Sequence, residues 1–212
     1  MEIKEQSGLR AVLADVELPR MAMIRQKFPR DGIEDVAAYL MEKLDREDLG
    51  SRIKPGMRVV LTGSSRKIAN MPLILRELAD YVRAQGAHPY IIPAMGSHGG
   101  ATAEGQREIL ESYGITEEAC RCPIFSSMET VQVGSLSNGD EVRVDRFAYE
   151  ADAVIVVGRI KAHTAFRGAY ESGLVKMMAI GMGKREGADS LHRAGFQWMG
   201  ERLPQYAKVI FD

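Results

Sequence analysis

The sequence has few cysteines, the residues that stabilise many small proteins through disulfides or zinc sites. It contains two cysteines, Cys120 and Cys122, among 212 residues. A C-x-C pair is too closely spaced for an unstrained disulfide between its own members, and two thiols do not complete a zinc site. We therefore expect both cysteines to be free thiols in a reduced protein.

Long apolar runs and an excess of charge of one sign are also absent. No apolar stretch approaches the roughly 18 residues of a membrane-spanning helix. The 28 basic and 29 acidic residues give a net charge of -1, which argues against nucleic acid or an anionic membrane as a partner. The N-terminal stretch MEIKEQSGLR is polar and charged, unlike a signal peptide. We infer a cytoplasmic location.

What is present is an alternation of β-prone runs and helical patterns. The β-prone runs are Arg58–Thr62, His88–Pro93 and Ala153–Gly158, and we read the last as a buried strand. Helical patterns follow the first two runs, up to Gln85 and over Ala103–Tyr113. This alternation predicts an α/β fold with a mostly parallel sheet and helices on both faces.

Several local signals refine this fold. The pattern over Thr130–Asp145 alternates around Asn138-Gly139, which predicts an antiparallel hairpin inserted into or flanking the sheet. Asp35 is a predicted N-cap of a helix over Asp35–Glu47, and Asn70 of the helix that ends near Gln85. Residues 1–34 predict short strands and loop.

The end of the chain predicts a strand. Gly195–Asp212 finishes with the apolar, β-prone run Lys208–Phe211. Because a finished domain seldom stops inside a strand, we expect residues 1–212 to form a single domain truncated from a longer, two-domain parent. An open terminal strand would also favour the pairing of two chains into a homo-oligomer.

Polar side chains follow each of the three predicted strands. Ser64-Ser65-Arg66 follows the first, His98 lies in the glycine-rich stretch Ala94–Ala101 after the second, and His163 follows the third. Parallel strands end at one edge of a sheet, so these loops are expected to converge on one site. The first loop suits a phosphate or carboxylate, although a Walker pattern is absent. The two histidines suit proton removal and return at one carbon, as in racemisation, or metal ligation.

The segment Arg159–His192 is basic and rich in glycine, and we interpret it as the main part of the site. Within it, Lys176 follows Ser172-Gly173-Leu174-Val175 and precedes a methionine-rich helix. A lysine beside apolar residues can be kept neutral and act as a nucleophile, or it can be a solvated surface residue. The methionines are interpreted as core residues.

In this order, the motifs resemble those of the nickel-pincer lactate racemase family. Its members carry Gly-[ST]-His after one strand, a second histidine after a later strand, a Ser-Gly-x-x-Lys motif and a further histidine beyond that lysine. The chain has Gly96-Ser97-His98, His163, Ser172–Lys176 and, 16 residues beyond Lys176, His192. The resemblance covers residues 55–195 and identifies the chain as the N-terminal domain of a divergent homologue.

The resemblance implies a racemase or epimerase of small 2-hydroxy acids. In the family, the lysine forms a thioamide bond to a modified nicotinic acid mononucleotide, which holds nickel by sulfur, carbon and sulfur and exchanges hydride with the substrate. A histidine supplies the fourth nickel ligand. The matching residues are Lys176 as the attachment point, His192 as the nickel ligand, His98 and His163 as the paired acid/bases, and Ser65, Arg66, Ser172 and Gly173 as further cofactor-binding residues.

The chain also departs from the family pattern. Gly63 and Lys67 stand where the family's substrate loop usually has Asp and Pro, so the substrate need not be lactate. The resemblance further implies partners: a second domain that adds substrate contacts, and enzymes that make the cofactor, without which the isolated chain is expected to be inactive. The alternatives are a non-catalytic anion- or nucleotide-binding domain that keeps the family fold, or an interaction domain with an apolar patch near Trp198–Phe211.

Overall fold

The computed structural model describes residues 14–17, 19–28, 31–193 and 195–212. The chain divides into two units, Met1–Gly32 and Ile33–Asp212. The described residues of the first unit contain no helix or strand, and their large apolar side chains at Met21, Met23 and Ile24 are exposed. The short strands predicted for residues 1–34 are therefore not found among the described residues, and part of that range lies outside them.

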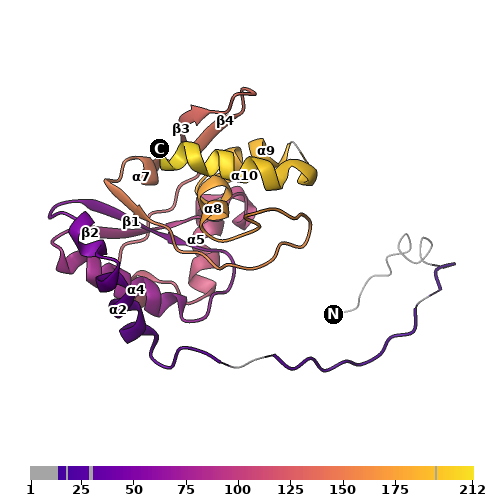
Figure 1. The fold of residues 1–212 in the computed structure, drawn as a ribbon, viewed down its shortest axis with the longest axis horizontal. Helices are drawn as coiled ribbons and strands as arrows, with labels where there is room; N and C mark the ends of the chain where they lie inside the picture. Colours follow the sequence, from indigo (N-terminus) through magenta and orange to yellow (C-terminus); the bar gives the residue numbers. More distant parts are fainter. Residues whose placement is uncertain (1–13, 18, 29–30, 194) are drawn as a thin grey trace. The chain divides into compact units, whose positions relative to one another are not determined.

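The second unit is built on a parallel sheet, which confirms the predicted α/β class (Figure 1). Its strands are β1 (Arg58–Gly63), β2 (His88–Pro93) and β5 (Ala153–Ile155), in the order β2-β1-β5. The central strand β1 is buried along its length after Arg58, as expected for a parallel strand covered on both faces.

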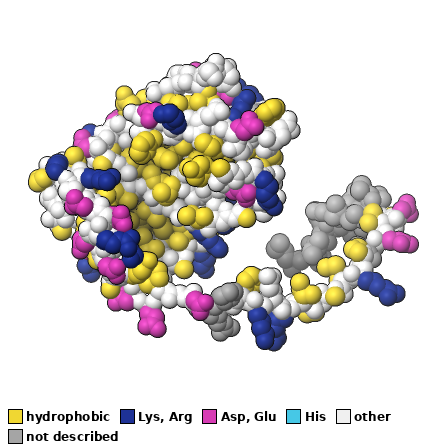
Figure 2. All heavy atoms as spheres, viewed as in Figure 1, with side chains coloured by type: hydrophobic (Ala, Val, Ile, Leu, Met, Phe, Trp, Pro, Cys, Tyr) yellow, Lys and Arg dark blue, Asp and Glu magenta, His cyan; other side chains and the backbone are white. Residues whose placement is uncertain are grey.

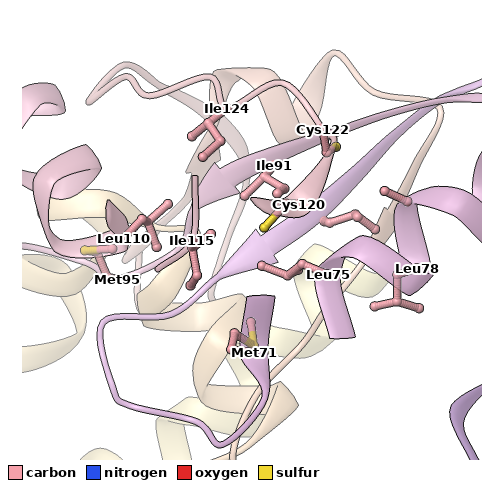
Figure 3. Packing of buried hydrophobic residues seen from close by; sticks show 12 residues of the cluster. Met71, Leu75, Leu78, Ile91, Met95, Leu110, Ile115, Cys120, Cys122 and Ile124 are labelled. Atoms are coloured by element: carbon pink, nitrogen blue, oxygen red, sulfur yellow. The ribbon is translucent and has the colours of Figure 1, made fainter. Parts of the chain in front are cut away.

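Helices cover one face of the sheet through a large apolar cluster. α4 (Met71–Ala84), α5 (Ala103–Ser112) and α6 (Glu117–Cys120) pack there against the side chains of Leu61 and Ile91. Figure 3 shows this cluster, with Cys120 between the strand residue Ile91 and the helix residue Leu75. Two short helices, α2 (Val36–Arg46) and α3 (Leu49–Arg52), lie before β1 in the chain, and α2 packs on α4.

The two cysteines belong to this core. Both are free and fully buried, which confirms the prediction of unpaired thiols. Because burial disfavours the thiolate, it raises the pKa of Cys120 to about 11 and that of Cys122 to about 12. The two residues therefore pack as small hydrophobic side chains and do not act as nucleophiles.

The opposite face of the sheet is covered by segments from later in the chain. Val60 and Ile92 pack there against α7 (Arg146–Tyr149) and against the helical segment that contains Met177, Met178 and Met182. These three methionines therefore fill the core, as predicted. With helices on both faces, each strand can be apolar throughout, and the sequence pattern of β1 and β2 follows from this arrangement.

The predicted hairpin is present and forms a sheet of its own. β3 (Thr130–Ser135) pairs antiparallel with β4 (Glu141–Asp145), with an irregularity in the register between Gln132 and Gly134. Gly139 in the turn has a φ of 88°, which explains why glycine occupies this position. The hairpin packs against α9 (Lys184–His192) and α10 (Phe196–Phe211) at one end of the unit (Figure 1).

The third predicted strand is shorter and less buried than expected. The prediction covered Ala153–Gly158, but β5 ends at Ile155 and its residues are only half-buried. The reason is Thr62, whose hydroxyl accepts a hydrogen bond from the Val157 amide at 2.8 Å and lies 3.3 Å from the Val157 carbonyl oxygen. A side chain thus replaces the backbone ladder at this point, and the chain turns out of the sheet.

The strand predicted at Lys208–Phe211 is wrong, because this run is the end of helix α10. Met199, Leu203 and Tyr206 are buried at helical spacing along α10 and continue an amphipathic pattern into the β-branched run. The helix tolerates Pro204 in its interior. The described C-terminal segment therefore offers no strand edge through which two chains could pair.

The two predicted helix caps have different outcomes. Asp35 caps α2 as predicted, with its carboxylate accepting a hydrogen bond from the Ala38 amide at 2.9 Å. Asn70 precedes α4, but its φ of 58° is left-handed and its side chain makes no capping hydrogen bond. An N-cap side chain reaches the helix from an extended backbone, and Asn70 lacks that geometry.

The surface is mixed in charge. In Figure 2, acidic and basic side chains alternate around a broad hydrophobic area of the larger unit. Among the described residues, no helix has both the length and the apolar content that crossing a membrane requires.

A buried ion pair joins the hairpin to the sheet. Lys184 and Asp145 have side chains that are 0% exposed, and Lys184 Nζ lies 2.9 Å from Asp145 Oδ2. Lys184 also donates to the Pro93 carbonyl at 2.6 Å. The other carboxylate oxygen of Asp145 accepts from the amides of Phe147 and Ala148 and so caps α7. This pair connects β4, α7 and α9 to the end of β2.

We expect Lys184→Met to lower the free energy of unfolding by about 3–5 kcal/mol, because it leaves the Asp145 carboxylate buried without its counter-charge. The matched control is Lys208→Met at an exposed lysine, which should change stability by less than about 0.5 kcal/mol. Denaturant titration of both variants measures the difference. Equal stability of the two would show that the buried pair does not hold these elements together.

Candidate functional site

The loops that follow β1 and β2 meet at the carboxyl edge of the sheet. Ser65 and Arg66 lie in the loop after β1, and His98 lies in the loop after β2. The Ser65 hydroxyl is 2.5 Å from His98 Nδ1. The convergence expected from parallel strands is therefore present for these two loops.

His98 lies in a positively charged setting. Partial burial, followed by the nearby charges of Arg66 and Lys176, lowers the pKa of its imidazole. Both effects disfavour the protonated ring. His98 is therefore a neutral imidazole near pH 7, able to accept a proton, with one nitrogen engaged by Ser65.

His163 lies in the loop after β5 and is held through its backbone. The Glu171 carboxylate accepts a hydrogen bond from the His163 amide at 2.8 Å, and the ring lies 4.3 Å, centroid to centroid, from the buried ring of Phe166. Desolvation, then Lys176 and Lys161, lower the pKa of His163, while Glu171 opposes them. This imidazole is also a neutral base near pH 7.

Ser172 and Gly173 shape the approach to Lys176. The Lys161 amide donates to the Ser172 hydroxyl at 2.6 Å, and that hydroxyl donates back to the Lys161 carbonyl. Gly173, with a φ of 77°, precedes α8 (Leu174–Lys176), and a Cβ there would lie 3.1 Å from the side chain of Ile160. Ser172 thus joins the two ends of the loop through its hydrogen bonds to Lys161, and Gly173 allows the turn into the helix that carries Lys176.

Lys176 ends α8 at the centre of this group. Its amine lies 5.8 Å from the ring centroid of Phe166 and, among the residues that the structure describes, has no carboxylate within ion-pair distance. Desolvation is the largest cause that lowers its pKa, followed by the charges of Lys161 and Arg66. These effects increase the fraction of neutral amine, which is the nucleophilic form.

His192 lies at the end of α9 and is exposed. The ring of Phe196 lies near both His192 and His163. Its centroid is 6.0 Å from that of the His192 ring and 6.3 Å from that of the His163 ring. Within the described part of the chain, no group of three or more His, Cys, Asp or Glu residues could hold a metal ion. A metal at His192 would therefore need further ligands from outside the protein.

The structure thus brings Arg66, His98 and His163 close enough to Lys176 for their charges to interact, whereas His192 lies near His163 and Phe196. Sequence reasoning missed the residues that complete this environment. Lys161 was visible only as one of several cations in a basic stretch, and Glu171 as one acid among many. Phe166 and Phe196 carried no signal, because their position depends on how the loop and α10 pack. The residues missed are Lys161, Phe166, Glu171 and Phe196.

We expect His98 and His163 to titrate below the ordinary histidine value of about 6.5. Because a lowered pKa means that the fold favours the neutral ring, their contribution to stability is present above the unfolded-state pKa. It is lost as the pH falls through the folded-state pKa values. Histidine NMR titration of the folded protein, compared with the same protein in denaturant, measures both. Midpoints at or above those of the unfolded chain would contradict the described environment.

The chain matches one known family over most of its length. The model of the lactate racemase N-terminal domain matches residues 12–202, and no curated protein matches the chain. The matched range contains every candidate residue discussed above and most of the described fold. The chain therefore belongs to the lactate racemase N-terminal domain family.

Proposed function

We propose that the chain is the cofactor-bearing domain of a nickel-pincer racemase or epimerase of small 2-hydroxy acids. The observation that carries this proposal is the position of Lys176. A half-buried lysine with a lowered pKa lies beside two neutral histidines that follow separate strands at one edge of the sheet. Family membership supports the racemase class.

The residues around Lys176 fit the cofactor implied by the family. A lowered pKa at Lys176 increases the fraction of neutral amine, the nucleophilic form that thioamide formation needs. Arg66 and Lys161 supply positive charge near the amine, where a mononucleotide phosphate would be favourable. His192 would supply the single protein ligand to nickel, and the pincer would supply the other three. The bound cofactor would supply a hydride acceptor for the substrate α-carbon.

The protein's own residues would handle the proton and the carboxylate of the substrate. His98 and His163 come from different strand ends, so each would exchange the hydroxyl proton for one enantiomer. Their lowered pKa values keep them neutral and ready to accept that proton. Arg66 is exposed in the loop beside His98 and would bind the substrate carboxylate.

The proposal includes partners. A second domain would close over the site and contact the substrate side chain, and cofactor-synthesis enzymes would deliver the nucleotide. The second candidate function is a non-catalytic anion- or nucleotide-binding domain. The cluster of Arg66, Lys161 and Lys176 favours it, because three nearby cations attract a phosphate without any covalent chemistry.

We expect Lys176→Ala to abolish covalent loading when the protein is co-expressed with cofactor-synthesis enzymes, because it removes the amine proposed to form the thioamide bond. Intact mass and nickel analysis measure loading. The matched control, Lys208→Ala, removes an exposed lysine and should load as the wild type does. His98→Ala and His163→Ala should also load, since their proposed role begins only with substrate.

Two results would contradict this assignment. Undiminished loading of Lys176→Ala would show that the attachment lies elsewhere. An unmodified wild-type mass, under conditions that load another family member, would favour the anion-binding function. In that case, phosphate binding that is lost in Arg66→Ala would identify the anion site.

A further inference from the structure

Gln106 is a fully buried amide in α5 that contacts the loop carrying His98. Its side chain is 0% exposed. Its Nε2 group donates to the Gly96 carbonyl at 2.7 Å and to the His98 carbonyl at 3.2 Å. One side chain thus fastens the backbone at His98 itself and at the residue two positions before it.

The orientation of this amide is fixed by the buried lysine behind it. Lys184 Nζ donates to Gln106 Oε1 at 3.1 Å and to the Pro93 carbonyl at 2.6 Å, and it pairs with Asp145 at 2.9 Å. An ammonium group only donates hydrogen bonds, so the amide oxygen of Gln106 faces Lys184. The two N–H groups then have to face the loop.

Backbone hydrogen bonds also hold the loop near His98, including one at 3.1 Å from the Gly96 amide to the Gly181 carbonyl. The His98 amide donates to the Met95 carbonyl at 3.2 Å, and the Ala101 amide donates to the His98 carbonyl at 3.3 Å. Gly99 and Gly105 touch directly, since a Cβ on Gly105 would lie 2.1 Å from the Gly99 carbonyl oxygen. This close approach brings the first turn of α5, and with it Gln106, against the loop.

We propose that Gln106 is the positioning residue of His98: oriented by Lys184, it holds the His98 backbone so that the ring meets Ser65 beside Lys176. The inference rests on the proposed acid/base function of His98 for its catalytic meaning, but its structural content does not depend on cofactor loading. Gln106 itself is buried behind the loop and acts through His98.

Two variants separate the contact of Gln106 with Lys184 from its contacts with the His98 loop. Gln106→Met keeps the length of the side chain and removes both the donors and the acceptor. Gln106→Glu keeps an acceptor for Lys184 and removes the two donors to the loop, so it tests the contact with His98 even where Gln106→Met fails to fold. The control is Val82→Ala in α4, a fully buried residue that packs with Ile53, Val59 and Ala87, in a different cluster.

The measurements are made on the unloaded protein. We expect the His98 titration midpoint to rise in both variants toward the ordinary histidine value, because a released ring moves into water and away from Arg66 and Lys176. Amide exchange at Ala101, which bonds to the His98 carbonyl, should accelerate by about tenfold, as expected when about one net hydrogen bond is lost from a local opening. His163 should titrate as in the wild type.

Two results would overturn the proposal. One is a folded Gln106→Glu protein with unchanged His98 titration and unchanged exchange. The other is an equal change in Val82→Ala, which would mean that general destabilisation moves the loop. Failure of the proposed function is distinguished from both, because absence of a cofactor adduct on Lys176 leaves the titration and exchange of the unloaded protein as they are.

Discussion

The arrangement of this domain depends on a buried charge pair. Lys184 and Asp145 are both withdrawn from water, and such a pair is tolerable only when the remaining polar atoms are satisfied. Here the lysine reaches the end of β2 and the amide of Gln106, and the carboxylate caps α7. The pair therefore joins the hairpin, the helices after Lys176 and the sheet at the strand end from which the His98 loop departs.

The candidate site lies at the carboxyl edge of the parallel sheet, next to the elements that this ion pair joins. Three loops leave the carboxyl ends of parallel strands, and their cations and imidazoles lie close together with partial loss of water. Burial is the largest cause that lowers the pKa values of Lys176, His98 and His163, and the neighbouring positive charges lower them further. The same surroundings that increase the neutral fraction of Lys176 and keep the two histidines neutral also favour the binding of an anion.

Much of this could be predicted from local sequence signals. The β-prone runs at β1 and β2, the Asn138-Gly139 turn and the Asp35 cap depend on neighbouring residues, and the structure agrees with each. The failures depend on distant contacts. β5 ends early because the Thr62 hydroxyl, and not a backbone carbonyl, accepts the hydrogen bond from the Val157 amide. The β-prone end of α10 is helical because it continues a row of buried residues that begins at Met199. In the site, motif order selected Lys176, His98 and His163 as candidates, and the structure places these three near one another. The contacts of Lys161, Phe166, Glu171 and Gln106 depend on packing and had no comparable sequence signal.

The proposed chemistry depends on a Lys176 amine that is more nucleophilic than an exposed lysine because burial and neighbouring cations lower its pKa. It is tested most directly by measuring how the acylation rate of each lysine in the unloaded protein depends on pH, with mass-spectrometric mapping of the labelled residues. Because the midpoint of each profile reports the pKa of that amine independently of its accessibility, Lys176 can be compared with an exposed lysine such as Lys208. We expect a midpoint for Lys176 below the ordinary lysine value of about 10.4. A midpoint at or above that value would contradict it.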